Sequence, residues 1–186
     1  MGKFFYSSAA SLDGYVEDPE GDFSWAAPDE QVHRHANDRT EESGLVIMGR
    51  RLYETMEPFW SEAAADPTGS EHVDEFARIW VRKPKLVFSR TLGSVPEPFG
   101  LIRELDPEWA AELRDKVEGT ITVGGASLAS AFAAAGLIDE VELITVPFVA
   151  GGGKPFFGPG FRGRRLEPLE TRRFDGGSVA ARYAVS

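Results

Sequence analysis

The sequence predicts a single α/β domain whose central sheet is mostly parallel and ends in an antiparallel hairpin. Short β-branched or apolar runs alternate with longer segments of helical periodicity, which is the pattern of strands joined by crossover helices. The last two strand-like runs, 166–174 and 179–185, are joined by Asp175-Gly176-Gly177, a sequence typical of hairpin turns. Because 186 residues suffice for one substantial core, we expect one domain over residues 1–186.

The composition excludes several classes of function. The chain has no cysteine, which excludes disulfides, thiolate metal sites and cysteine nucleophiles, so redox chemistry would require a bound cofactor. Thirty acidic against twenty basic side chains give a formal charge of −10, which opposes binding to nucleic acid or to an anionic membrane. The chain contains no run of eighteen apolar residues and no signal-peptide pattern, so we expect a soluble cytoplasmic protein.

The first half of the chain is predicted to hold three strands and three helices. The strands are 4–10, 45–48 and 85–88, and the helices are 28–42, 52–56 and 71–81. Pro28 suits the first position of a helix, and Asp29 and Glu30 suit its positive first turn. Residues 57–70 contain proline and glycine and are interpreted as an irregular loop, a candidate lid or oligomer contact.

The second half continues the alternation. Asp106 as N-cap and Pro107 at the first position begin a helix whose apolar face carries Trp109, Leu113 and Val117. The remaining predicted elements are a strand at 121–123, a helix at 126–135, a strand at 141–147 and a glycine-rich turn at 148–157.

Gly124 and Gly125 lie where a predicted strand ends and a predicted helix begins. The first-turn amides of a helix have no partners inside it, and with the helix dipole they form a site for an anion such as a phosphate. Two residues without Cβ atoms let a phosphate approach the backbone closely. The alternative, a tight strand-to-helix turn with no ligand, remains open from this stretch alone.

Two further strand ends carry groups suited to phosphate. Gly49-Arg50-Arg51 follows one strand, and the guanidinium forks bind phosphate through charge-assisted hydrogen bonds. Ser89-Arg90-Thr91 follows the next strand. Because ligands of α/β sheets gather at the carboxyl ends of strands, phosphate binding is favoured over the alternative that the arginines only balance nearby carboxylates.

The first predicted helix and the loop before it offer candidates for a pocket. His33 and Asn37 are one turn apart and share a face with Asp29, although the spacing alone favours a solvated helix. The loop at 17–28 contains Phe23 and Trp25, which either line a site or close the edge of the core.

Other catalytic motifs are not supported. Residues 125–129 follow a strand as a hydrolase nucleophile elbow does, but all three histidines precede Ser127, and Ala129 replaces the second glycine. The pair His33 and His35 has no third ligand at a recognisable spacing, so no metal site is expected.

Five motifs in order along the chain carry a resemblance to a known family. They are Ser11-Leu12-Asp13-Gly14, Met48-Gly49-Arg50-Arg51, Lys85-Leu86-Val87-Phe88-Ser89-Arg90-Thr91-Leu92, Val123-Gly124-Gly125-Ala126 and Gly151-Gly152-Gly153-Lys154-Pro155-Phe156-Phe157. The series resembles the dihydrofolate reductase-like superfamily, and within it stand-alone relatives of the reductase domain of the bifunctional riboflavin-biosynthesis deaminase-reductase. The resemblance covers nearly the whole chain. Counting back from Gly49 without gaps reaches His33 where dihydrofolate reductases carry an acid on the first helix.

The resemblance implies NADPH bound across the carboxyl ends of the strands. Cofactor contacts are expected from Val16, Gly49, Arg50, Arg51, Ser89, Arg90, Thr91, Gly124, Gly125, Ala126, Ser127 and Leu128. On this reading residues 124–128 hold the pyrophosphate, with a cis peptide at Gly124-Gly125. The arginines and Ser89 meet the adenosine 2′-phosphate, and Val16 lies beside the nicotinamide.

The expected function is an NADPH-dependent reductase that transfers hydride to a C=N or C=O carbon of a small heterocycle. The substrate would be pteridine- or pyrimidine-like, as for 5-amino-6-(5-phosphoribosylamino)uracil reductase or dihydrofolate reductase. Substrate contacts are expected from Trp25, Asn37, Phe59, Trp60 and Phe148. His33 is the first candidate for a proton-donating group, because imidazole titrates near neutral pH, and Asp29 is the second.

The alternative is a non-catalytic NADP(H)-binding protein with a degenerate substrate site. A homodimer is expected only from the resemblance, with the terminal hairpin or the segment around Phe59 and Trp60 as possible contacts.

Overall fold

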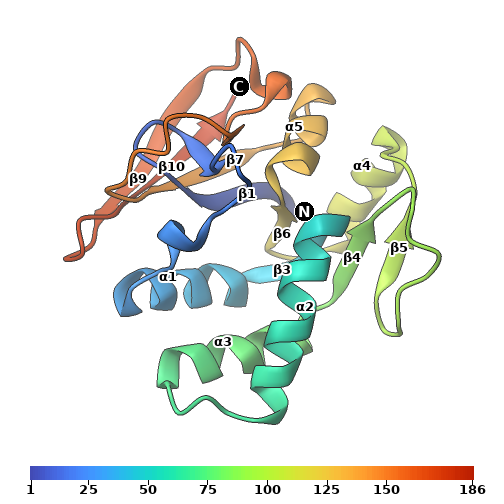
Figure 1. The fold of residues 1–186 in the computed structure, drawn as a ribbon. Helices are drawn as coiled ribbons and strands as arrows, with labels where there is room; N and C mark the ends of the chain where they lie inside the picture. The colour runs from blue at the N-terminus through green and yellow to red at the C-terminus, as the bar shows by residue number, and fades with distance from the viewer.

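The computed structural model describes residues 1–186 and shows an eight-stranded sheet with helices on both faces (Figure 1). The strands are β1 (Lys3–Ala10), β2 (Tyr15–Glu17), β3 (Ser43–Gly49), β4 (Lys85–Phe88), β5 (Gly100–Ile102), β6 (Thr120–Gly124), β7 (Glu140–Thr145), β8 (Lys154–Pro155), β9 (Leu166–Arg173) and β10 (Val179–Val185). The helices are α1 (Glu30–Glu41), α2 (Arg50–Ala65), α3 (Glu71–Arg82), α4 (Pro107–Lys116) and α5 (Ala126–Ala134), with 3₁₀ turns η1 (Ser24–Ala26) and η2 (Pro159–Phe161).

The sheet order is β5-β4-β3-β6-β1-β7-β10-β9. Every pair from β5 to β7 is parallel, whereas β10 pairs antiparallel with both β7 and β9. The predicted fold class, a mostly parallel sheet that ends in an antiparallel hairpin, is therefore confirmed. Two short strands, β2 and β8, form a separate antiparallel pair beside the carboxyl end of β1.

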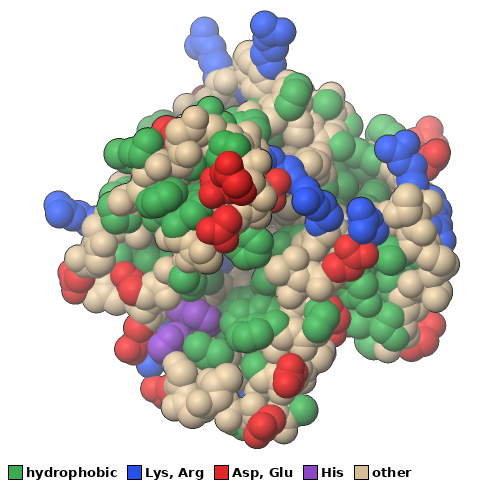
Figure 2. Space-filling view, viewed as in Figure 1, with side chains coloured by type: hydrophobic (Ala, Val, Ile, Leu, Met, Phe, Trp, Pro, Cys, Tyr) green, Lys and Arg blue, Asp and Glu red, His purple; other side chains and the backbone are tan.

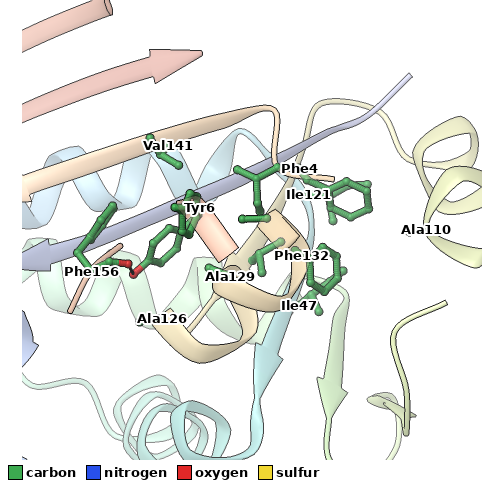
Figure 3. Packing of buried hydrophobic residues seen from close by; sticks show 14 of the residues in the cluster. Phe4, Tyr6, Ile47, Ala110, Ile121, Ala126, Ala129, Phe132, Val141 and Phe156 are labelled. Carbon is green, nitrogen blue, oxygen red and sulfur yellow. Dashed lines mark hydrogen bonds between the residues drawn. The ribbon is translucent and has the colours of Figure 1, made fainter. Parts of the chain in front are cut away.

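The main core lies between the sheet and helices α4 and α5. Side chains alternate along β1, so Phe4 and Tyr6 reach the same cluster as Phe132 of α5 (Figure 3). Phe4 and Phe132 meet edge to face with ring centroids 5.2 Å apart. Each of these rings is fully buried, and burial of a large apolar side chain contributes about 1.5–3 kcal/mol.

The other face of the sheet is covered by α1, α2 and α3 (Figure 1). On β3, Leu45 and Ile47 join the main core, while Val46 and Met48 face a second cluster with Phe76 of α3. A strand buried on both faces requires a continuous apolar run, which is why residues 45–48 lack alternation.

The structure corrects the prediction for residues 52–70. Helix α2 runs over Arg50–Ala65, so only 66–70 form the expected loop, and the interpretation of 57–65 as irregular was wrong. Pro58 lies inside the helix and removes one backbone hydrogen bond. The helix continues beyond Pro58 because its apolar side chains, at helical spacing, pack against the second cluster around Phe76. These side chains are Leu52, Tyr53, Met56 and Trp60.

Helix α1 begins two residues later than predicted. Asp29 is its N-cap and accepts a hydrogen bond of 2.9 Å from the Val32 amide, so this carboxylate lies before the helix and not within its first turn. None of the helices is long and apolar enough to cross a bilayer.

Candidate functional site

Three strand ends with phosphate-compatible groups lie side by side in the sheet. β3 has β4 on one side and β6 on the other, with Gly49 opposite Phe88 and Met48 opposite Gly124. Residues far apart in sequence therefore meet at one edge: Gly49, Ser89 and Gly125. This is the carboxyl edge of a parallel sheet, where ligands of such sheets bind.

The turn from β6 into α5 depends on its two glycines. Gly125 is the N-cap of α5 and has a φ of +96°, a conformation that residues with a Cβ rarely adopt. A Cβ at Gly124 would lie 2.6 Å from Leu52 Cδ2 of α2. The expected cis peptide at Gly124-Gly125 was wrong, because Glu97-Pro98 is the only cis bond and the left-handed conformation of Gly125 turns the chain instead.

Two helix N-termini converge at this edge, because α2 begins after Gly49 and α5 begins after Gly125. Neither N-cap provides a side-chain hydrogen bond, so the first-turn amides of Ala126, Ser127 and Leu128, like those at the start of α2, have no capping partner. A Cβ built on Gly49 would lie 4.0 Å from Leu128 Cβ of α5. The adjacent positive ends of two helix dipoles favour an anion between them.

The three predicted phosphate-binding arginines differ in whether a carboxylate already pairs with them. Arg50 pairs with Glu54 at 2.8 Å, as the charge-balancing alternative anticipated. Arg51 is largely exposed and lies 3.6 Å from Glu17 of β2. Arg90 is exposed and has no carboxylate partner, which leaves it available to an anionic ligand. Lys and Arg side chains gather near the start of α2 in the space-filling view (Figure 2).

The Ser89 hydroxyl is engaged within the turn after β4. It accepts hydrogen bonds from the amides of Thr91 and Leu92 at 3.2 and 3.0 Å, and the residue is buried. The Arg103 guanidinium donates to the Ser89 carbonyl at 2.9 Å. The side chain therefore shapes the turn that presents Arg90.

The glycine-rich turn at 151–153 is held against the end of β1. Asp13 accepts hydrogen bonds from the amides of Ala150 and Gly151 at 3.0 and 2.8 Å. The hydrogen bond from Ser11, followed by those from these amides, holds the pKa of Asp13 below its usual value. β2 pairs with β8 here, and Val16 of β2 packs against the main core.

A second group of predicted residues lies between α1, α2 and α3. His33 Nδ1 is 3.0 Å from Asn37 Oδ1, and the His33 ring meets Trp60 of α2 edge to face at 5.9 Å. Burial lowers the pKa of His33, and the nearby His72 lowers it further. Phe59 is exposed beside Trp60, with ring centroids 4.8 Å apart.

Trp25 and Phe148 form a separate aromatic pair. Their rings stack at 4.9 Å with an interplanar angle of 15°, which joins the loop before α1 to the segment after β7. The structure thus brings the predicted substrate residues into two groups. The Asp29 carboxylate is occupied by its helix cap.

Sequence reasoning missed two residues in the histidine group. His72 contributes its backbone carbonyl and Glu75 its carboxylate, and both accept from Asn37 Nδ2, at 2.9 and 2.7 Å. His72 and Glu75 are three residues apart on the predicted helix 71–81, so they share one face of it. Nothing in the sequence indicates that this helix face contacts Asn37.

Two cavities are bordered by other parts of the chain. One of about 410 Å³ is lined only by polar residues, including His35, Arg39 and Glu170, and one of about 620 Å³ is lined by residues 155–166. Neither includes a predicted cofactor residue. No group of three or more potential metal ligands is present.

The model of the RibD C-terminal domain matches residues 3–180 of the sequence. The chain belongs to this family. Among its relatives, the uncharacterized protein YyaP of Bacillus subtilis is 28% identical over 176 residues, which cover 94% of this chain and 90% of YyaP. A RibD C-terminal domain over nearly the whole chain supports a reductase-type function.

Solved structures share the fold of this RibD-type domain. A candidate riboflavin biosynthesis protein from Shewanella sp. PV-4 has a TM-score of 0.77 at 21% identity, with 99% of both chains covered. The deaminase/5-amino-6-(5-phosphoribosylamino)uracil reductase of Thermotoga maritima has a TM-score of 0.69 at 14% identity, and this chain covers 57% of it. Dihydrofolate reductase from Enterococcus faecalis, solved with NADP(H), has a TM-score of 0.67 at 14% identity, with 100% and 97% of the two chains covered.

Proposed function

We propose that this RibD-type domain is an NADPH-dependent oxidoreductase that reduces a C=N or C=O carbon of a small pteridine- or pyrimidine-like heterocycle. The observation that carries the proposal is the convergence of two helix N-termini without side-chain caps at Gly49 and Gly125, in a chain of a reductase-domain family. Free amides, a glycine turn and a nearby unpaired arginine fit a dinucleotide with a 2′-phosphate.

The cofactor-binding roles follow from the positions of these groups. Residues 124–128 would hold the pyrophosphate through backbone amides. Arg90, Arg51 and Arg50 would meet the 2′-phosphate, and Thr91 lies in the same turn as Arg90. Val16, carried by β2 beside the glycine-rich turn, would line the nicotinamide pocket.

The cofactor supplies the hydride, and the protein aligns the two rings and excludes water. His33 and Trp60 would form one wall of the substrate site, with the buried Asn37 behind His33. Trp25 and Phe148 would cover it from the loop side, and Phe59 would lie at its rim. Such a site binds a flat ring by stacking and edge contacts.

The experiment is a titration with NADPH and with NADH, followed by tryptophan and reduced-nicotinamide fluorescence. Loss of one charge-assisted hydrogen bond to the 2′-phosphate weakens binding by about tenfold, so Arg90→Ala should weaken NADPH binding by about this factor and leave NADH binding unchanged. Arg162→Ala, at an exposed arginine outside this edge, is the matched control. An equal loss for both nucleotides, or no binding of either, would contradict the proposed cofactor site.

A non-catalytic NADP(H)-binding protein is the second candidate. It is favoured by one observation: Asp29 is engaged in a helix cap and His33 Nδ1 in a hydrogen bond, so neither has a free acidic proton to give to a substrate. Stoichiometric NADPH binding without oxidation against a panel of pteridines and pyrimidines would support this alternative.

We also propose a homodimer. Strand β9 is an edge strand with almost all of its side chains exposed, including Leu169. Unpaired edges of this kind are available for association. Light scattering after size exclusion measures the mass directly, and a monomer at all concentrations would contradict the proposal.

A further inference from the structure

The hydrogen bonds around Asn37 fix the orientation of its side-chain amide. Asn37 Nδ2 lies 2.9 Å from the His72 carbonyl oxygen and 2.7 Å from Glu75 Oε2, and both of these atoms only accept. The reverse orientation would set the amide oxygen against a carbonyl and a carboxylate. The amide oxygen therefore faces His33, at 3.0 Å from Nδ1.

This orientation also fixes the tautomer of His33. An amide oxygen cannot donate, so Nδ1 must carry the proton in the bond to Asn37. In the neutral ring the lone pair is then on Nε2. No group of the chain donates to Nε2, and this atom is not among the fully buried polar atoms without a partner, so it keeps contact with solvent although only 8% of His33 is exposed. Histidine atoms are visible at the surface between α1 and α3 (Figure 2).

The surroundings of His33 favour the neutral ring. Burial is the largest cause of its lowered pKa, and His72 of α3 adds to it, while the bond to Asn37 and the charge of Glu75 oppose it. Arg34 of α1 lies 4.0 Å from Glu75 and partly neutralises that carboxylate. From α2 the ring meets Trp60, which carries no charge.

We propose that His33, locked as the Nδ1–H tautomer by Asn37, is a hydrogen-bond acceptor that selects a substrate with an N–H on the edge of its ring. Asn37 and Glu75 are positioning residues that act through His33. The substrate class is thus a cyclic amide or amidine that presents an N–H to Nε2, and a ring with only carbonyl oxygens on that edge is disfavoured. The substrate part of this inference rests on the proposed function, whereas the tautomer part does not.

The tautomer is tested by long-range ¹H–¹⁵N correlation spectra of ¹⁵N-histidine-labelled protein at neutral pH without ligand. We expect a protonated Nδ1 and a pyridine-type Nε2 at His33 in the wild type. Glu75→Gln retains an acceptor for Asn37 and should keep this pattern. Asn37→Leu removes the acceptor of the Nδ1 proton and should shift the population toward the Nε2–H form that free histidine favours. A wild-type ring that is protonated on Nε2, or on both nitrogens at neutral pH, would overturn the inference whether or not Asn37→Leu folds.

The substrate class is tested with uracil and 1,3-dimethyluracil as probes on protein saturated with NADPH. Uracil offers ring N–H donors and its dimethyl derivative has none. Uracil should move the His33 Nε2 resonance and bind about fivefold more tightly than 1,3-dimethyluracil, and Asn37→Leu should abolish this preference. An equal response to both probes would overturn the acceptor role. NADPH binding is measured separately by fluorescence, so a failure of the cofactor site is distinguished from a failure of the acceptor.

Discussion

The substitution Gly124→Ala tests the closest contact at the convergent strand ends. Its Cβ would lie 2.6 Å from Leu52 Cδ2 and 3.4 Å from the Ile47 carbonyl oxygen. Carbon atoms in ordinary contact are about 3.5–4.0 Å apart, so the Leu52 side chain has to move by roughly 1 Å. Leu52 lies in the first turn of α2 and packs against the cluster around Met48 and Phe76.

We expect Gly124→Ala to lower the free energy of unfolding by about 1–3 kcal/mol, the range for an overpacked site. Displacement of the first turn of α2 should also weaken NADPH binding. The second substitution Leu52→Ala removes the clashing atoms, so the double variant should recover about 1–2 kcal/mol relative to the sum of the single effects. Urea unfolding followed by tryptophan fluorescence measures all three free energies.

Gly49→Ala is the matched control, because it changes a glycine at the neighbouring strand end where the nearest atom is 4.0 Å from the added Cβ and φ is −74°. We expect it to cost at most about 1 kcal/mol, from the poorer N-cap, with no recovery from Leu52→Ala. A Gly124→Ala variant as stable as the wild type, or one that Leu52→Ala fails to rescue, would refute the packing argument.

The remaining predictions concern the buried acid of β7 and the aromatic pair. Burial alone would raise the pKa of Glu142, yet His35 at 3.1 Å and Arg39 at 3.1 Å hold it below its ordinary value of 4.5. Since the folded pKa is the lower one, this group stabilises the protein fully above its unfolded pKa, and that stability is lost as the pH falls through the folded pKa. Glu142→Gln should lower the free energy of unfolding by about 3 kcal/mol at neutral pH. It should also weaken the fall of this free energy with decreasing pH, which unfolding curves measured at several acidic pH values report. An unchanged dependence on pH would contradict the role given to Glu142. Phe148→Ala should cost about 1 kcal/mol and speed proteolysis of the loop at 17–28, whereas Phe148→Tyr, which keeps the stack with Trp25, should show neither change.

Local patterns in the sequence were sufficient for most of the fold. The run at 45–48 is apolar on both faces, and the structure buries it on both. Asp106 and Pro107 begin α4 as predicted, with the Asp106 carboxylate accepting from the Glu108 amide at 2.9 Å. Such signals depend on neighbours in the chain, so they can be interpreted without a tertiary partner.

The length of α2 is a case where local signals failed. Pro58 and the glycine and proline that follow it at 67–69 favour a break, but Met56 and Trp60 gain burial against α3 and the helix continues. The gain depends on a partner helix that begins at residue 71, which no window around Pro58 contains.

The sequence alone determined the parallel sheet, its terminal hairpin and the glycines at two helix starts, because each depends on backbone conformation and local periodicity. The tertiary structure alone decided that the ends of β4, β3 and β6 are neighbours, since strand order is set by long-range packing. It also decided the chemistry of His33. Burial between α1, α2 and α3 lowers its pKa, and α3 brings His72 and Glu75 to Asn37, so that hydrogen bonds between distant elements fix the proton of His33 on Nδ1.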